Sequence, residues 1–176
     1  MTLLIILVIL TTAILVGVLF SFMLDDLVEK YMGEQALIVA ELAAQNEEII
    51  QAFDDENPSV VIQRISEQIQ RTTNADYVTI ANRQSIRYSH PNPENIGKPT
   101  ATSNKPVFEQ GKPIIYRGNG ISGPAIKAKV PIFNKRGEII GVSSVGFLNN
   151  NIEKEIENYR NKLFQLAIIP LFIGLI

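Results

Sequence analysis

The sequence predicts an α+β domain with N-terminal helices and a central antiparallel sheet, placed between two apolar runs. Two observations carry this prediction: a change of pattern near residue 74 and the order of the two resulting blocks. Before residue 74 the apolar residues recur at intervals of three and four, which is typical of amphipathic helices, whereas over 75–148 they alternate, which is typical of strands. A block of helices followed by a block of strands indicates an α+β fold. The apolar runs cover residues 1–24 and 163–176.

The first apolar run contains no charged side chain, and a helix of its length crosses a hydrocarbon core of about 30 Å. We therefore expect a transmembrane helix over 1–24. A secretory signal peptide is the alternative, although the run lacks a basic start and a small-residue cleavage site before Asp25. Residues 163–176 are expected to begin a second transmembrane helix that is truncated, with a buried core helix as the alternative.

Residues 25–53 predict a long helix, because apolar side chains recur at three and four residues with acids between them. No proline interrupts this stretch, so we expect it to continue the first apolar run as a stalk. The sequence DDENP at 54–58 ends it, since the residue before a proline disfavours the helical conformation. Ser59 is the expected N-cap of a second helix that ends near Thr73, which completes a helical part over 25–74.

Five strands are predicted over 75–148, because apolar and polar side chains alternate between turn signals. The first two, 77–81 and 85–89, are joined by a short turn and predict a hairpin. A loop rich in proline and glycine follows, with a helical turn around residues 104–109. A linker helix is expected over 149–162, leading directly into the second apolar run. The remaining strands are expected at 113–117, 125–133 and 138–148.

Composition excludes several kinds of site. The chain has no cysteine and a single histidine, so a disulfide framework, a thiol nucleophile and a multi-histidine metal cluster are excluded, and we expect no cofactor or metal. The net charge of −2 hides an asymmetry: over 76–147, ten basic residues face four acidic ones, whereas acids predominate over 25–73. This basic half indicates an anionic partner, but nucleic acid is not expected, because no aromatic residues are interleaved with the bases.

Two short motifs concentrate the positive charge. In SIRYSHP, Arg87 projects from the predicted second strand and His90 lies at its end, beside a proline. In KAKVP, Lys127 and Lys129 are two residues apart, so they point to the same face of their strand. Like charges on one face repel each other, and a bound carboxylate relieves this repulsion by accepting hydrogen bonds from both. A solvent-exposed basic surface is the alternative.

The order of these motifs resembles the extracytoplasmic sensor domain of citrate and C4-dicarboxylate sensor histidine kinases, the CitA/DcuS type. The resemblance rests on RxxHP, a proline- and glycine-rich loop that ends in IG, GxxGxxxKxKVP, an NKRG turn and GEIIGVSSVG. It implies a PAS-like fold over 25–162, between two transmembrane helices of a multi-pass protein of the cell membrane. It also implies a homodimer, and a kinase region and response regulator outside this chain. This fragment itself is not expected to be an enzyme.

The resemblance also implies a carboxylate site. Lys127 and Lys129 stand where the family has R-x-K, so this chain keeps the charge and lacks the bidentate fork of arginine. Ser143 is an adjacent candidate to the serine of the last strand, and the glycine-rich turn offers backbone N–H groups. The residues expected to bind the ligand are Thr79, Arg87, His90, Gly120, Ser122, Lys127, Lys129 and Ser144.

From these residues we expect a sensor that binds citrate or a related di- or tricarboxylate. Six side chains that donate hydrogen bonds favour the larger anion. We expect the ligand to draw the 92–112 loop towards the basic strands and to shift the last strand and the helix that follows. A protonated His90 should strengthen binding of the anion. The alternative is a chemoreceptor or adhesion ectodomain with a similar fold and another ligand or a protein partner.

Overall fold

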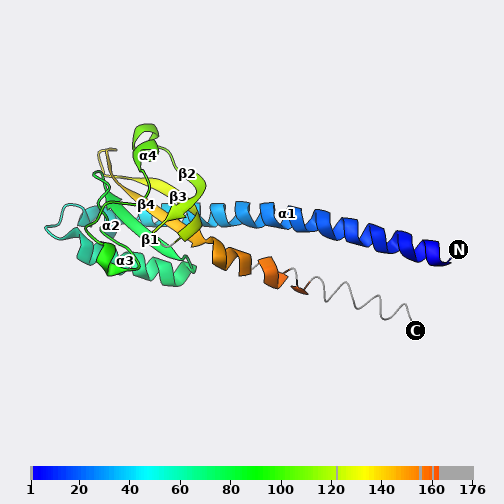
Figure 1. Cartoon of the computed structure of the whole chain (residues 1–176). Helices are drawn as coiled ribbons and strands as arrows, with labels where there is room; N and C mark the ends of the chain where they lie inside the picture. Colours follow the sequence, from blue (N-terminus) through cyan, green and yellow to red (C-terminus); the bar gives the residue numbers. More distant parts are fainter. Residues whose placement is uncertain (1, 122, 155, 160, 163–176) are drawn as a thin grey trace. The chain divides into compact units, whose positions relative to one another are not determined.

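The computed structural model describes residues 2–121, 123–154, 156–159 and 161–162 (Figure 1). The chain divides into two compact units, one of Met1–Tyr31 with Asn150–Ile176 and one of Met32–Asn149. Helix α1 (Thr2–Ala44) begins in the first unit and ends in the second. In the first unit, every described residue over 150–162 is helical, as the sequence predicts. The second unit contains the sheet and the remaining helices.

The transmembrane helix predicted over 1–24 is corrected by the structure. In the part of the chain that the structure describes, no helix has the length and apolar character needed to cross a membrane. Residues 2–24 form the first part of α1, which continues beyond the apolar run into the charged sequence from Asp25 onwards. The second predicted membrane helix, 163–176, lies outside the described residues.

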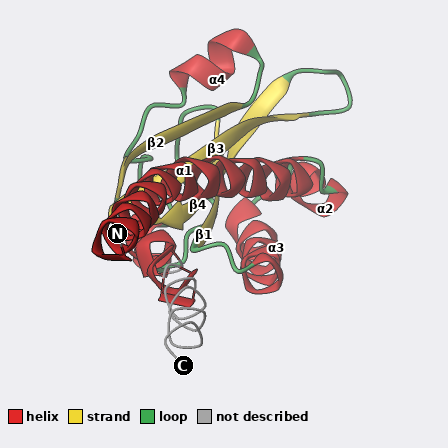
Figure 2. Ribbon diagram, turned by 90° about the vertical axis from the view of Figure 1, so that its right-hand side faces the viewer, coloured by secondary structure: helices red, strands yellow, loops and turns green. Residues whose placement is uncertain are grey.

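The sheet of the second unit has four antiparallel strands in the order β1-β4-β3-β2 (Figure 2). The α+β class is as predicted, but the sheet has four strands and not five. The three later strands fall close to their predicted positions. The strands are β1 (Tyr77–Asn82), β2 (Ile114–Gly120), β3 (Gly123–Phe133) and β4 (Ile139–Leu148).

The missing fifth strand is 85–89, which the sequence predicts as the partner of β1 in a hairpin. The turn forms, with the Ser85 N–H donating to the Asn82 carbonyl at 2.8 Å. The returning segment then divides its backbone hydrogen bonds between two neighbours. The Tyr88 N–H donates to Ile80 in β1, and the Arg87 N–H donates to Lys98 in the following loop. Each side therefore forms only an isolated bridge and no continuous ladder.

The helices differ from the prediction at their ends. The long helix does not reach residue 53, because Asn46 starts a new helix, α2 (Glu47–Ala52), by accepting the Ile49 N–H on its side chain at 3.1 Å. Helix α3 (Pro58–Thr73) follows, with Pro58 in its first turn and Asn57, not Ser59, as the residue before it. The turn predicted at 104–109 is α4 (Lys105–Gln110), after a 3₁₀ turn η1 (Pro93–Asn95).

One face of the sheet packs against helices and forms the main core. The α1 side of this core is built of small residues such as Ala36, Ala40 and Ala43, all fully buried, which let the helix approach the strands closely. At Gly33 a Cβ atom would lie 2.9 Å from the Cγ2 of Ile115, so a side chain there requires Ile115 or the helix to shift. The opposite face carries a smaller apolar cluster under α4, formed by Ala81, Val107 and Val142. The remaining area of that face carries the polar residues of the candidate site.

Candidate functional site

The strand register brings polar side chains into two rows on the sheet face opposite the main core. In the first row, Thr79 of β1 pairs with Ser144 of β4, which pairs with Lys129 of β3. In the second row, Tyr77 pairs with Gly146, which pairs with Lys127. Because side chains alternate along a strand, residues two apart on each strand share one face. Their neighbours Val78, Val145 and Ala128 therefore point into the main core.

A cavity opens above these rows. About 50 Å³ of it is open to the centres of water-sized molecules, and its empty space together with the adjoining open solvent is about 520 Å³. Seven of the eight expected ligand residues line this cavity, and the eighth, Ser122, lies outside the described residues. The lining comes from the two rows, from the segment after β1, from the loop before α4 and from the β2–β3 turn. Ile121 and Gly123 of the lining belong to the glycine-rich turn expected to offer backbone N–H groups. The lining residues that the sequence did not predict are Tyr77, Ala81, Thr100, Ala101, Thr102, Asn104 and Val142.

Lys129 is held by the loop before α4. The residue is 1% exposed, and its ammonium group donates to three neutral acceptors: the carbonyls of Thr102 at 3.2 Å and Ser103 at 2.9 Å, and Oδ1 of Asn104 at 2.6 Å. Burial, and secondarily the charge of Lys127, lowers the pKa of Lys129 from 10.5 to about 8. At pH 7 this buried group is therefore charged and has no carboxylate partner among the described residues.

Lys127 is also buried and lies next to the β2–β3 turn. A Cβ atom on Gly120 would be 2.8 Å from its Nζ, which shows how closely the turn backbone approaches the ammonium group. The ring of Tyr116 lies near both lysines, with its centroid 5.9 Å from Nζ of Lys127 and 5.8 Å from Nζ of Lys129. Burial lowers the pKa of Lys127. In the described part of the chain, no carboxylate or hydrogen-bond acceptor contacts this ammonium group.

Arg87 and His90 reach the cavity from the segment that follows β1. Arg87 is 3% exposed and its guanidinium donates to the Asn95 carbonyl at 3.3 Å, and burial lowers its pKa. The imidazole Nδ1 of His90 accepts the Asn92 N–H at 3.0 Å, and the Asn95 amide nitrogen lies 3.4 Å from it. The Asn92 carbonyl oxygen lies 3.2 Å from the same Nδ1, so this nitrogen donates to that oxygen when it carries a proton and accepts the Asn92 N–H when it does not. Burial and the charge of Arg87 lower the pKa of His90, against a smaller opposing effect of the Asn92 backbone.

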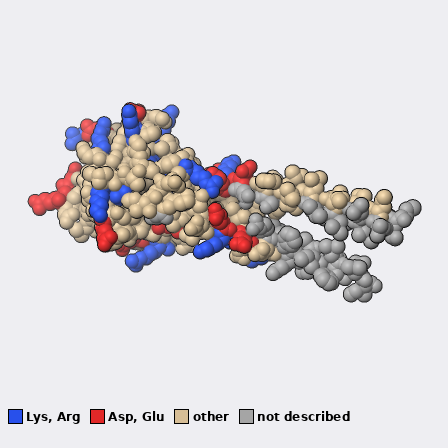
Figure 3. Space-filling model, in the orientation of Figure 1, with Lys and Arg blue, Asp and Glu red and all other residues tan. Residues whose placement is uncertain are grey.

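The cavity therefore concentrates positive charge without a compensating acid. Arg87, Lys127 and Lys129 line it, and none of its described lining residues is acidic. Burying an unpaired charge is costly, so an arrangement of this kind is typical of a site for an anion. The face of the molecule seen in Figure 3 does not have this character. On this face lysine and arginine atoms lie in separate patches with acidic atoms between them, and they do not form one continuous basic area.

Two predictions about hydroxyl groups have different outcomes. Ser144 lines the cavity, beside Thr79 in the first row. Ser143, the adjacent candidate, points to the other face of the sheet, where it is fully buried. Its hydroxyl has no hydrogen-bond partner among the described residues. Tyr77, which the sequence analysis missed, was within reach of the same reasoning, since it is two residues before Thr79 and so shares its face.

Comparison with known proteins places the chain among sensor proteins. Residues 23–161 match the family model described as single cache domain 3. The chain is 36% identical over 163 residues to the sensor protein CitS of Halalkalibacterium halodurans, covering 92% of this chain and 30% of the relative. It is 35% identical over 134 residues to the sensor histidine kinase DpiB of Escherichia coli K12, covering 76% and 24%. A probable C4-dicarboxylate sensor kinase of Halalkalibacterium halodurans is 27% identical, covering 83% and 28%.

Solved structures show the same fold. The sensor domain of Escherichia coli DcuS superposes with a TM-score of 0.69 at 24% identity, covering 74% of this chain and 98% of that one. The sensor domain of the Vibrio cholerae histidine kinase DctB superposes with a TM-score of 0.58 at 19% identity, covering 69% and 50%. The chain spans about a third or less of the length of the curated relatives it matches. The predicted resemblance to sensor regions of the CitA/DcuS type is thus confirmed.

Proposed function

This chain belongs to the single cache domain 3 family, and on that basis we propose that it is the ligand-binding sensor domain of a two-component histidine kinase that detects citrate or a related di- or tricarboxylate. The observation that carries the proposal is the cavity lined by Arg87, Lys127 and Lys129 with no acidic residue among its described lining. In this proposal the domain lies outside the cytoplasm, and the kinase region and its response regulator lie beyond this chain.

The ligand class follows from the geometry of the two rows and of the segment above them. Lys129 and Ser144 lie on the floor, whereas Arg87 and His90 approach from the segment after β1. Cationic groups on different sides of one cavity suit a molecule with carboxylates at more than one end. The 50 Å³ interior is small for a ligand site, so such a molecule must extend from it into the adjoining open space.

Lys129 connects the ligand to the loop before α4. A carboxylate that approaches its ammonium group competes with the Thr102 and Ser103 carbonyls and with Asn104, because the three protons of the ammonium already have acceptors. Ligand binding therefore changes the hydrogen bonds that hold this loop. Because Lys129 belongs to β3, which pairs with β4, the change can pass from β3 into β4. Helical residues follow β4 directly in the chain, which provides a covalent route for the signal.

The proposed assembly is a homodimer. Helix α1 leaves large apolar side chains exposed within the second unit, with Ile38 57% and Leu42 55% exposed. These two residues are four apart and so share one face of the helix, which suits a matching face on a second copy. Replacing Ile38 by Glu should shift the molecular mass measured by analytical ultracentrifugation to that of a monomer. An unchanged mass would contradict this interface.

Isothermal titration of the chain with citrate, malate and succinate tests the ligand. We expect saturable binding of at least one of them and a loss of about 100-fold in affinity for Arg87→Ala, because a charge-assisted hydrogen bond is removed. Arg136→Ala is the matched control, since Arg136 is exposed and does not line the cavity. Absence of binding in a folded wild-type chain, or an equal loss in both variants, would contradict the proposed function.

A further inference from the structure

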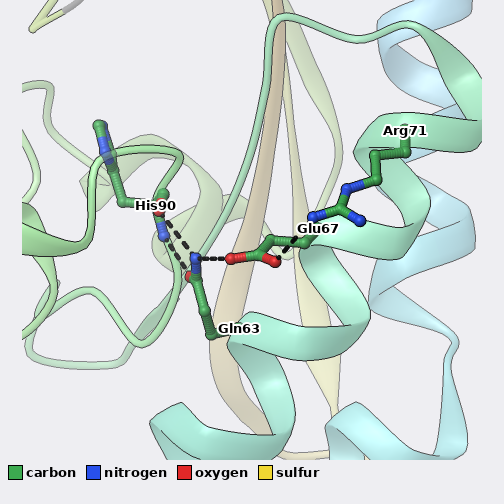
Figure 4. Close-up of polar contacts among 4 residues, drawn as sticks. All are labelled: Gln63, Glu67, Arg71 and His90. Carbon is green, nitrogen blue, oxygen red and sulfur yellow. Dashed lines mark hydrogen bonds and ion pairs between the residues drawn. The ribbon is translucent and has the colours of Figure 1, made fainter.

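Gln63 of α3 holds the backbone of His90 at two points. The Nε2 of its side-chain amide donates to the His90 carbonyl at 3.1 Å, and the His90 N–H donates to its Oε1 at 2.9 Å (Figure 4). One amide group thus pairs both main-chain polar groups of His90, as a neighbouring strand would do. This segment does not form the predicted strand, and the next residue, Pro91, has no N–H to donate.

One turn further along α3, a second contact holds the preceding residue. The Ser66 hydroxyl donates to the Ser89 hydroxyl at 2.9 Å, and Ser89 Oγ also accepts the Ile80 N–H of β1 at 2.8 Å. Ser66 is 2% exposed and Ser89 is fully buried. Since residues three apart on a helix share a face, Gln63 and Ser66 together bind two consecutive residues of the segment that carries the imidazole.

The orientation of the Gln63 amide is itself fixed. Its Nε2 also donates to Oε1 of Glu67 at 2.8 Å, and Glu67 forms an ion pair of 3.5 Å with Arg71 (Figure 4). Because the amide nitrogen faces two acceptors, the amide oxygen must face the His90 N–H. The ion pair is exposed to solvent and contributes little, so the amide–carboxylate contact is the part that sets the orientation.

The imidazole points away from α3, on the far side of its own backbone (Figure 4). Its Nδ1 contacts Asn92 and Asn95, whereas Nε2 has no hydrogen-bond partner among the described residues, and His90 lines the cavity. We propose that Gln63 is a positioning residue: by holding the His90 main chain against α3, it aims the imidazole at the ligand. This inference rests on the proposed function for its ligand, and on the hydrogen bonds alone for its geometry.

The single histidine of the chain makes this inference directly measurable, because every imidazole NMR signal belongs to His90. Gln63→Met removes both backbone hydrogen bonds at nearly constant length. We expect its His90 pKa to move towards the ordinary value of 6.5 and its citrate affinity to fall about tenfold. Gln68→Met is the matched control, because Gln68 is exposed on the same helix, and should change neither.

A second pair of variants keeps the test valid if Gln63→Met unfolds. Gln63→Glu loses the ability to donate to the His90 carbonyl and places a second carboxylate beside Glu67. We therefore expect this variant to have the lowest citrate affinity of the set. Adding Glu67→Gln restores the amide–carboxylate pair in the opposite order and keeps the bond from the His90 N–H. We expect the double variant to recover part of the affinity and to melt at a temperature near that of the wild type.

Two results would overturn the positioning role: a folded Gln63→Met chain with wild-type His90 titration and wild-type affinity, or a double variant no better than Gln63→Glu. The charged group that acts on the imidazole is Arg87, and it is unchanged in all of these variants. If the wild-type chain bound none of the carboxylates, the proposed function would fail. The His90 pKa of the variants without added carboxylate would still decide the role of Gln63.

Discussion

The ammonium group of Lys129 lies 2.6 Å from Oδ1 of Asn104, and this contact joins the floor of the cavity to the loop that covers it. Asn104 is 1% exposed, and its amide nitrogen donates to the hydroxyls of Ser85 at 3.1 Å and Thr100 at 3.2 Å. Asn104 thus links three chain segments around one buried positive charge. The domain stabilises its most buried lysine with neutral oxygens, which are weaker partners for a cation than a carboxylate.

The first prediction concerns the pH dependence of stability in the absence of added carboxylate. The folded pKa of Lys129 is about 8, below its ordinary 10.5, so the unfolded chain binds more protons between these values and the free energy of unfolding rises with pH. We expect Lys129 to contribute about 1 kcal/mol of added stability between pH 8 and pH 9. Urea unfolding of wild type and Lys129→Met at pH 8 and pH 9 measures this contribution. The change in the free energy of unfolding is compared between the two chains, so that the contributions of other titrating groups cancel. An equal change in both chains would contradict the lowered pKa.

The second prediction concerns ligand binding at low pH. Burial and Arg87 lower the pKa of His90, and a bound anion stabilises the protonated imidazole, so its pKa must be higher in the complex. Binding then takes up a proton, and citrate affinity should rise as the pH falls from 7.5 to 5.5. Citrate itself titrates in this range, and its effect cancels when the affinity of wild type is divided by that of His90→Gln at each pH. A ratio that stays constant across this range would show that His90 does not contribute.

The third prediction uses the close approach of the β2–β3 turn to Lys127. A methyl group in Gly120→Ala would lie 2.8 Å from the ammonium nitrogen, so the flexible lysine must move while the backbone stays in place. We expect about a tenfold loss of carboxylate affinity with little change in melting temperature. Gly17→Ala is the control, because its added methyl group would meet no atom within 4 Å apart from the adjacent residues and backbone of its own helix. A large fall in melting temperature would indicate that Gly120 supports the fold instead.

The fourth prediction compares two fully buried serines on opposite sides of β1. The Ser143 hydroxyl has no partner among the described residues, so Ser143→Ala should be neutral or stabilise the chain by up to about 1 kcal/mol. Ser89→Ala removes the acceptor of the Ile80 N–H and should destabilise it by about 2 kcal/mol. Thermal unfolding of both variants gives the comparison. Equal destabilisation would mean that volume, not hydrogen bonding, decides both sites.

The spacing of apolar residues predicted much of this fold, because the side chains on one face of a helix or strand all meet the same surroundings, either the core or the solvent. The break at Asn46 was missed because its cap depends on a single side-chain contact that leaves the apolar spacing intact. The fifth strand was predicted wrongly because 85–89 alternates like a strand, but its hydrogen bonds go to two different neighbours. The alternation of apolar and polar residues in a segment does not show how many neighbouring segments it will pair with.

The residues of the candidate site were likewise predicted only in part. Lys127 and Lys129 were placed on one face by their spacing, and the motif RxxHP gave Arg87 and His90. Asn104 and Gln63 were missed because their roles arise from contacts with residues 25 and 27 positions away in the sequence. An uncharged amide in a loop or on a helix carries no signal of such a contact until the chain has folded.

The two rows across β1, β4 and β3 restrict how relatives of this domain can diverge. In the middle of these strands the side chains alternate between the cavity face and the apolar interior, so an insertion of one residue in β4 would send Ser144 inward and Val145 into the cavity. New ligand preferences must therefore arise by exchanging side chains at fixed positions on the floor. Changes in length are tolerated only in the loops that form the walls, and there we expect evolution to have adjusted how large a metabolite is admitted.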